Sequence, residues 1–415
     1  VPAKVIGYRV GPTVTQFAVE PGYFDKGNTE EKQKVRISQI SGLSRDLALA
    51  LKAERLRIEA PVPGESYVGI EVPNTEHTLV RLRPLLESPE FASAKSSLAI
   101  PLGRGVSGQP IVSDLAGMPH LLIAGTTNSG KSVCIAALTM SLVMNNNPDD
   151  LKLVMIDPKR VELNRFNGLP HLLGEVETNI DRIMAVLRWA TTEMDNRYRL
   201  LEVVHARNLD SYNQKMDKLG KPRMPRVVLL IDELADLMIS APDETEGAIV
   251  RLAQKARAVG IHLVVATQRP STDIITGVIK ANLPTRIAFT VASSVDSRVI
   301  LDVSGAETLL GKGDLLFHHA EAGHPQRAQG VLVSDHEIRR VIAWWQKQEL
   351  QDQSNPMTLV LPETNTGQKT ESSEEIEPDD NAEDEVPWEK DVKTQNESDG
   401  DETLIREATE LVRVK

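Results

Sequence analysis

An eight-residue stretch of the chain matches the phosphate-binding pattern G-x-x-x-x-G-K-[ST] at every fixed position. Its residues are Gly125, Thr126, Thr127, Asn128, Ser129, Gly130, Lys131 and Ser132. The glycines permit backbone geometries that turn successive N–H groups toward a polyphosphate, and the lysine places a positive charge beside the β- and γ-phosphates. The hydroxyl of Ser132 is a ligand type for Mg²⁺. We therefore expect a nucleotide site here, with Lys131 in a catalytic role.

The residues on either side of this loop supply the structural context that the pattern requires. Residues 120–124 form a short apolar run typical of a buried strand, and residues 132–144 form a largely apolar stretch typical of a helix. A loop between a strand and a helix N-terminus directs the positive end of the helix dipole at bound phosphate. A Gly- and Ser-rich turn that matched by chance would lack this context.

A second motif provides groups that nucleotide hydrolysis needs. Residues 227–231 form a continuous apolar run, as expected of a central parallel strand buried on both faces, and Asp232 and Glu233 follow it directly. Asp232 is placed to hold Mg²⁺ through water, and Glu233 is placed to polarise an attacking water as a catalytic residue. A second interpretation is that Glu233 opens a helix, whose N-terminus favours carboxylates, and both interpretations can hold together.

Two further apolar strands are expected to end in polar residues. Residues 153–156 run into Asp157 and Lys159, and residues 261–266 run into Gln268. Ligands gather at the carboxyl ends of strands in open α/β sheets. Gln268 is therefore a candidate catalytic residue that senses the γ-phosphate or orients water. The alternative is a polar side chain that caps a loop.

The chain divides into four parts. Residues 1–95 are typical of a small α/β domain that opens with a hairpin around Gly11-Pro12. In residues 96–350 apolar strands alternate with helical stretches, which predicts a parallel α/β sheet. Residues 351–400 are acidic and rich in Ser, Asn and Pro, as in a disordered linker, and residues 401–415 regain helical spacing.

The net charge of −12 is unevenly distributed. Residues 351–415 hold 19 of the 59 acidic residues and 6 of the 47 basic residues, so the first 350 residues carry 40 acidic and 41 basic side chains. The first 350 residues are therefore almost neutral, and the acidic total does not exclude contact with nucleic acid.

The composition also indicates where the chain resides. Cys134 is the single cysteine, so no internal disulfide can form, and a packed core thiol is favoured over a redox role. No run approaches the ~18 apolar residues of a membrane span, and the first residues lack a signal-peptide pattern. We expect a soluble, cytoplasmic chain.

Many ordered phrases of the sequence resemble the bacterial FtsK/SpoIIIE family of DNA translocases. They are AGTTNSGKSV, DPKRVEL with GLPHLL, LLIDELADLM, RLAQKARAVGIHLVVATQRPSTDIITGVIKANLPTRIAF, and SSVDSRVILD with GAETLLGKGDLLF. The upstream phrases SGLSRDLALAL and PVPGESYVGIEVPN extend the resemblance to about residues 5–345. Family members often carry Ala and Gly in place of Thr126 and Asn128, but neither is a fixed position of the phosphate-binding pattern.

This resemblance implies a domain organisation. Residues 96–350 would be a RecA-like P-loop ATPase motor domain with a parallel central sheet, and residues 1–95 would be the small alpha-type domain that precedes it. Residues 401–415 would be the truncated start of a gamma-type winged-helix domain, after the acidic linker. Membrane-spanning helices would precede Val1, so that the full-length protein is anchored in the inner cell membrane.

The resemblance also implies a function and a set of residues. The chain would use ATP and Mg²⁺ to move double-stranded DNA through a homo-oligomeric, hexameric ring during chromosome segregation linked to cell division, with recombinase or division-protein partners. Arg286 would complete the site of a neighbouring subunit, as arginines commonly do in phosphoryl transfer. Arg298 and Arg327 would contact DNA phosphates from two channel loops.

Alternatives stay open for these residues and for the function. Arg286 could be a solvated residue at a strand edge, and Arg298 and Arg327 could be ordinary surface residues. The chain could instead belong to a related ring ATPase that exports protein or conjugative DNA. A third possibility is a nucleotide-gated DNA-binding scaffold with little turnover, against which Lys131, Asp232 and Glu233 argue because they form a complete hydrolytic set.

Overall fold

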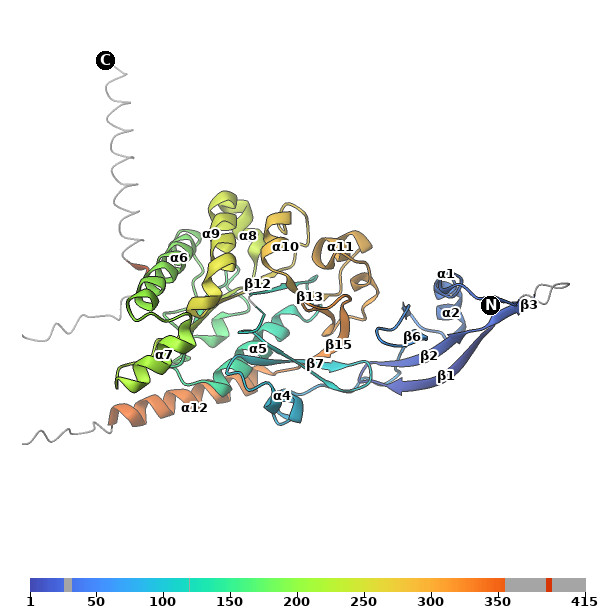
Figure 1. Ribbon diagram of the computed structural model, residues 1–415, viewed down its shortest axis with the longest axis horizontal. Coiled ribbons are helices and arrows are strands. Elements are labelled where there is room, and N and C mark those ends of the chain that lie inside the picture. The colour runs from blue at the N-terminus through green and yellow to red at the C-terminus, as the bar shows by residue number, and fades with distance from the viewer. Residues whose placement is uncertain (26–31, 119, 355–385, 390–415) are drawn as a thin grey trace, which may run out of the picture.

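The computed structural model describes residues 1–25, 32–118, 120–354 and 386–389 (Figure 1). A small domain, drawn in blue in Figure 1, extends from one end of a larger α/β domain. Within these ranges, none of the helices combines the length and the apolar character that a bilayer crossing demands.

The small domain is built on an antiparallel sheet with the strand order β1-β2-β6-β5. The predicted hairpin around Gly11-Pro12 is confirmed as β1 and β2. Val19, Leu56 and Ile70 are buried at the centre of the domain. Its elements are β1 (Ala3–Val10), β2 (Val14–Pro21), β3 (Tyr23–Asp25), β4 (Lys32–Lys34), α1 (Ile37–Ser41), α2 (Ser44–Ala50), β5 (Arg57–Glu59) and β6 (Val68–Pro73).

The larger domain contains a sheet whose described strands follow the order β10-β11-β12-β9-β13-β14-β15-β7-β8. The parallel strands are β10 (Leu151–Ile156), β11 (Arg226–Ile231), β12 (Ile261–Thr267), β9 (His120–Ala124) and β13 (Thr285–Phe289). An antiparallel extension follows, made of β14 (Asp314–His318), β15 (Gln326–Gly330), β7 (Ala99–Gly105) and β8 (Pro110–Asp114). The predicted parallel α/β sheet is confirmed at its centre.

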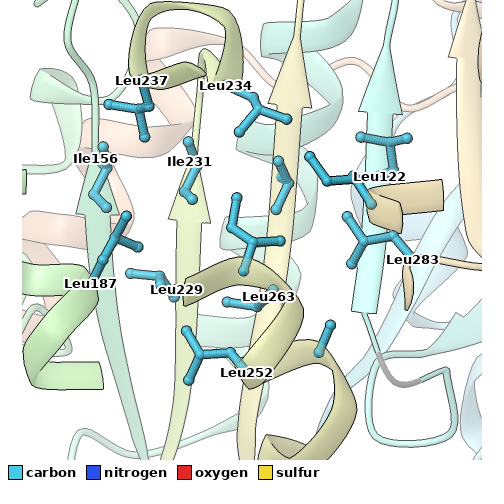
Figure 2. Close-up of a cluster of buried hydrophobic side chains, with 14 of the residues drawn as sticks. Leu122, Ile156, Leu187, Leu229, Ile231, Leu234, Leu237, Leu252, Leu263 and Leu283 are labelled. Carbon is cyan, nitrogen blue, oxygen red and sulfur yellow. The ribbon is translucent and has the colours of Figure 1, made fainter. Parts of the chain in front are cut away.

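The parallel strands alternate their side chains between two apolar cores, one on each face of the sheet. In β11, Leu229 and Ile231 belong to the first core, and Val228 and Leu230 belong to the second. Figure 2 shows the first core, where Leu187 of a covering helix lies beside these strands. Burial on both faces explains why the strands are continuous apolar runs in the sequence.

Helices cover both faces of this sheet. The first core is covered by α6 (Ile180–Val203), α8 (Leu234–Ser240), α9 (Pro242–Lys255), α10 (Gly277–Asn282) and α11 (Ser294–Leu301). The second core receives residues of α3 (Leu82–Leu86), α5 (Lys131–Asn145) and α12 (Asp335–Ser354). The remaining helices include α4 (Pro89–Ser93) and α7 (Leu209–Lys218). The carboxyl ends of the parallel strands are left free to build a site between these layers.

The larger domain begins earlier than the expected boundary at residue 95. Val80, Leu82 and Leu85 are buried in the second core of the larger domain. The backbone N–H of Leu332 donates to the carbonyl of Val80 at 2.8 Å, which ties this segment to the residues after β15. Packing therefore assigns residues from about 80 onward to the larger domain.

A buried ionic cluster joins the two domains. The guanidinium of Arg327, on β15, donates to Glu71 of the small domain at 2.6 Å and to both carboxylate oxygens of Asp314 at 2.9 and 2.5 Å. Arg57 donates to the other oxygen of Glu71 at 2.9 Å. The Arg327 side chain is only 3% exposed. The expectation that Arg327 contacts DNA is therefore wrong in this structure, because two carboxylates enclose its donors.

The acidic segment, residues 351–400, differs in part from the expected linker. Helix α12 continues to Ser354, and residues 386–389 pack against the larger domain, with Trp388 fully buried. The rest of this segment and the helical stretch predicted at 401–415 lie outside the described residues. At 386–389, therefore, the chain is docked rather than free.

Replacing Arg327 by Ala should lower the free energy of unfolding by about 3–5 kcal/mol, because Glu71 and Asp314 would then be buried without a countercharge. Urea denaturation would measure the decrease. Arg298→Ala is a matched control, since Arg298 is exposed on α11 and should leave the midpoint unchanged. Equal midpoints for Arg327→Ala and the unsubstituted protein would show that the cluster does not stabilise the domain joint.

Candidate nucleotide-binding site

The loop that matches the phosphate-binding pattern is hydrogen-bonded to residues at the ends of three neighbouring strands. It follows β9 and leads into α5, as predicted. The N–H of Gly125 donates to the carbonyl of Thr267 at 3.3 Å, and the N–H of Thr126 donates to the carbonyl of Thr290 at 3.0 Å. The carbonyl of Ser129 accepts from the N–H of Gly313 at 2.8 Å. The loop therefore sits at the carboxyl edge of the parallel strands.

The two fixed glycines of the pattern are required by the fold. Gly130 has a φ of +119°, and a Cβ at this position would lie 2.7 Å from the Cα of Gly313. A Cβ on Gly125 would lie 2.6 Å from the Cβ of Phe289. Any larger side chain would push the loop away from the strands that position it.

Lys131 is buried and bonded to the second motif. Its Nζ donates to the backbone carbonyl of Asp232 at 2.6 Å and to Oδ1 of the same residue at 2.7 Å. Burial raises the pKa of Asp232, and the Lys131 ammonium opposes that shift. The structure thus brings together the charged residues of the two motifs, which lie 101 positions apart in the sequence.

The atoms that could hold Mg²⁺ are also present. Oδ2 of Asp232 and Oγ of Ser129 are buried and have no hydrogen-bond partner among the described residues. Ser132 lies in the first turn of α5 and lines a cleft beside the phosphate-binding loop. The described residues contain no cluster of three or more His, Cys, Asp or Glu side chains of the kind that encloses a metal by itself. One carboxylate and a hydroxyl fit Mg²⁺, which usually retains water and phosphate oxygens as its other ligands.

Glu233 is fully buried and held by several donors. Its Oε1 accepts from the Thr267 hydroxyl at 2.7 Å and from the Gln268 N–H at 3.1 Å, and its Oε2 accepts from Lys159 Nζ at 2.7 Å. Burial raises the pKa of Glu233, but the hydrogen bonds from Lys159, Thr267 and Gln268 outweigh it, so the pKa is lowered. Glu233 also caps α8 by accepting from the Ala235 N–H. Both interpretations of this carboxylate are thus compatible with its position.

Gln268 links the phosphate-binding loop to Glu233. Its side-chain Oε1 accepts from the Thr127 hydroxyl at 2.9 Å, and its backbone N–H donates to Glu233. Gln268 lines a cleft of about 420 Å³ together with Lys131 and Ser132. This position suits a residue that senses the γ-phosphate, and it also satisfies the loop-capping alternative.

Sequence reasoning missed the roles of Asp157 and Lys159. Asp157 is fully buried, and its carboxylate accepts from the backbone N–H groups of Lys159, Val161, Glu162 and Leu163. This turn places Lys159 against Glu233. The available signal was the phrase DPKR directly after an apolar strand, at the same sheet edge as Asp232.

Arg286 does not face the cleft of its own subunit. Its guanidinium donates to the carbonyls of Leu283, Ile300 and Lys280 and to Oδ2 of Asp302 at 2.5 Å. The side chain is only 10% exposed. The structure therefore favours a structural role, although Arg286 is a buried helix cap rather than the solvated strand-edge residue of the alternative.

The two arginines predicted to contact DNA lie away from the cleft, whereas Cys134 is among its lining residues. Arg298 is exposed on α11 and has no ion pair in the described part of the chain. Arg327 is enclosed at the domain joint. Cys134 is buried in α5, and burial raises the pKa of its thiol to about 12, which confirms the predicted core thiol.

Two family models match the chain, the FtsK alpha domain at residues 1–74 and the FtsK/SpoIIIE family at residues 81–272. The chain belongs to the FtsK/SpoIIIE family. The resemblance inferred from the sequence is thereby confirmed. The break between the two FtsK/SpoIIIE matches also agrees with the domain boundary near residue 80 that the packing indicates.

Curated relatives in the FtsK/SpoIIIE family cover most of this chain. The DNA translocase FtsK of Clostridium tetani is 50% identical over 345 residues, which are 83% of the chain and 45% of the relative. The DNA translocase SpoIIIE of Bacillus subtilis is 46% identical over 385 residues, which are 91% of the chain and 47% of the relative. The chain thus spans about half the length of the curated relatives it matches.

Solved structures share the fold. The pCW3 conjugation coupling protein TcpA, solved with ATPgS, is 23% identical with a TM-score of 0.57, covering 83% of this chain and 94% of that chain. The cytoplasmic domain of the type VII secretion ATPase EccC of Thermomonospora curvata is 26% identical with a TM-score of 0.53. The match covers 59% of this chain and 31% of that chain. The predicted RecA-like P-loop fold, preceded by a small domain, is confirmed.

Lys131→Ala should weaken binding of ATP by about 10- to 100-fold, because a hydrogen bond to a charged group contributes ~1.5–3 kcal/mol. Titration with a fluorescent ATP analogue would measure the change. Unchanged affinity would mean that the lysine does not reach the phosphates.

The same substitution leaves Asp232 buried without its countercharge, so weaker binding has a second possible cause. The double variant Lys131→Ala/Asp232→Asn removes both charges and should recover thermal stability without recovering ATP affinity. Recovery of affinity in the double variant would show that unfolding, and not a missing bond to phosphate, had weakened binding.

Proposed function

We propose that this chain is the motor of an ATP-driven translocase that moves double-stranded DNA through a ring of subunits, in chromosome segregation linked to cell division. The observation that carries the proposal is the position of Glu233. Its buried carboxylate, kept ionised by Lys159 and Thr267, lies at the same sheet edge as the phosphate-binding loop. An ionised carboxylate there can accept a proton from an attacking water.

We assign parts in this chemistry to the other residues at and beside the phosphate-binding loop. Lys131 binds the β- and γ-phosphates, and Gln268 contacts the γ-phosphate or the water. Ser132 and Asp232 hold Mg²⁺, which neutralises phosphate charge when bound. Charge on the transferred group is also commonly neutralised by an arginine from a neighbouring subunit. Arg286 takes that role only by releasing Asp302 and the three backbone carbonyls to which it donates.

Double-stranded DNA is the substrate that the relatives support best. FtsK, SpoIIIE and SftA are each named DNA translocases, at 46–50% identity. We assign phosphate contact to Arg298, which is exposed and not paired with a carboxylate in the described residues. The structural likeness to a secretion ATPase and a conjugation protein, at 26% and 23% identity, is weaker support for export of protein or conjugative DNA.

Exposed apolar side chains on β1 of the small domain support assembly into a ring of subunits, which we propose to be a hexamer. Val5, Ile6, Tyr8 and Val10 of β1 are all more than half exposed. Contiguous apolar residues on a surface mark an interaction site. A neighbouring subunit would cover them.

Linear duplex DNA should raise the rate of ATP hydrolysis several-fold, and raising the salt concentration should remove this stimulation because phosphate contacts release counterions. The measurement is steady-state ATPase with and without duplex, at several salt concentrations. Hydrolysis that DNA does not change would favour an export ATPase. Nucleotide binding without turnover would favour the scaffold alternative.

Glu233→Gln should lower kcat by roughly 10²–10⁴-fold while ATP affinity is kept, because only the proton acceptor is removed. Lys159→Ala should lower kcat less, by about ten-fold, because Glu233 keeps its bonds to Thr267 and Gln268. Lys159→Arg retains a cation and serves as the control. Near-normal kcat in Glu233→Gln would place the catalytic base elsewhere.

Arg298→Ala should reduce stimulation by DNA and flatten the slope of log affinity against log salt by about 0.9, the change expected when one arginine no longer binds a DNA phosphate. Arg199→Ala, an exposed arginine on α6, is the matched control. The effect should be similar for any duplex sequence. An unchanged slope would remove Arg298 from the DNA-binding surface.

A further inference from the structure

Four residues of the acidic segment, Val386–Glu389, occupy a defined place on the larger domain. Trp388 is fully buried and belongs to the first core, beside residues of α6. Its ring centroid lies 5.4 Å from that of Trp189, with the planes tilted by 59°. A fully buried tryptophan is unexpected in a segment rich in acidic and polar residues. Burial of its large ring supplies energy that holds the segment on the domain.

The surface under these residues is shaped to receive them. Gly174 has a φ of +90°, and a Cβ there would lie 2.3 Å from Cγ1 of Val386 and 3.3 Å from the Trp388 ring. Val386 and Leu173 pack at the margin of the first core. Only glycine leaves room for the docked segment at this position.

Polar contacts fix the orientation of the indole. Nε1 of Trp388 donates to Oε1 of Glu177 at 2.7 Å. Glu177 also accepts two hydrogen bonds from Arg182, at 2.9 Å each, and Arg182 in turn pairs with Glu389 at 3.1 Å. The Glu177 side chain is only 9% exposed, and it would lose one of its hydrogen-bond donors if Trp388 left this position. The network therefore recognises both the N–H of a tryptophan and the acidic residue that follows it.

We propose that Val386–Glu389 is a linear docking motif, and that Gly174, Glu177, Arg182 and Trp189 form a peptide-binding site for a segment of the form apolar-Pro-Trp-acidic. The segment binds as a turn, closed by the N–H of Glu389 donating to the carbonyl of Val386 at 2.9 Å. Pro387 limits the backbone freedom of this turn and reduces the entropy lost on docking. The motif fastens the acidic segment to the side of the motor domain.

The docking site shares backbone with the nucleotide site. The N–H of Glu177 donates to the carbonyl of Met155, and the N–H of Asp157 donates to the carbonyl of Glu177, each at 2.9 Å. Asp157 opens the turn that presents Lys159 to Glu233. Hydrogen exchange at the backbone amides of Glu177 and Asp157 therefore depends on whether the motif is docked.

Hydrogen exchange on the full chain tests the proposal. Trp388→Ala should speed exchange at least ten-fold in segments 386–389 and 174–182, and Trp388→Phe should give a smaller increase because it keeps the ring but removes the N–H donor. Trp344→Ala is the matched control, since Trp344 lies on α12 and is 54% exposed. Exchange in Trp388→Ala equal to that of the unsubstituted chain would overturn the proposal.

A peptide with the sequence of residues 383–392, EDEVPWEKDV, provides a second test. Labelled with a dye, it should bind the full Trp388→Ala chain at least ten-fold more tightly than the unsubstituted chain, whose own motif occupies the site. Adding Glu177→Gln to the Trp388→Ala chain should reduce that binding at least ten-fold. Equal affinity for both chains, no measurable binding, or equal binding of a peptide with Ala in place of Trp would each overturn the proposal. Unchanged binding of the fluorescent ATP analogue confirms that the variant is folded.

Discussion

Three carboxylates are buried at the carboxyl edge of the parallel strands, and the arrangement of the site depends on keeping each of them compensated. A buried charge without a partner costs several kcal/mol of stability, so each of these carboxylates needs hydrogen-bond donors of its own. Asp157 is satisfied by backbone N–H groups, Asp232 by Lys131, and Glu233 by Lys159 and Thr267. The loops after β9, β10, β11 and β12 are placed by these bonds as much as by the apolar cores.

This constraint gives Lys131 two duties. It compensates Asp232 inside the protein, and in the proposed function it also binds phosphate. A bound nucleotide with Mg²⁺ would supply another positive charge to Asp232 as the lysine turns to the phosphates. The buried and unpartnered Oδ2 of Asp232 is suited to that exchange. Fold stability and nucleotide affinity are therefore linked at one side chain.

Much of the fold and of the cleft could be predicted because the signals are local. Apolar runs predict strands buried on both faces, and Gly125, Gly130 and Lys131 lie within one short loop. The partners of Arg327 and Lys159 could not be predicted, because Glu71 lies 256 positions from the first and Glu233 lies 74 positions from the second. Periodicity identifies an element but does not say which distant charge it will meet. The same limit concealed the docking of Trp388, whose polar partner Glu177 lies 211 positions away.

The cluster of Arg327, Glu71 and Asp314 has a mechanical consequence. Apolar surfaces can slide past each other at little cost, whereas sideways movement of the small domain must break the buried ion pair between Glu71 and Arg327, whose guanidinium is held in place by Asp314. The joint is thus stiff against shear. A load applied to the small domain would pass through Glu71 to β15 and β14, then across the ladder to β13 and β9, the strand that carries the phosphate-binding loop. Force on one domain and strain at the nucleotide site are connected by a short, rigid route.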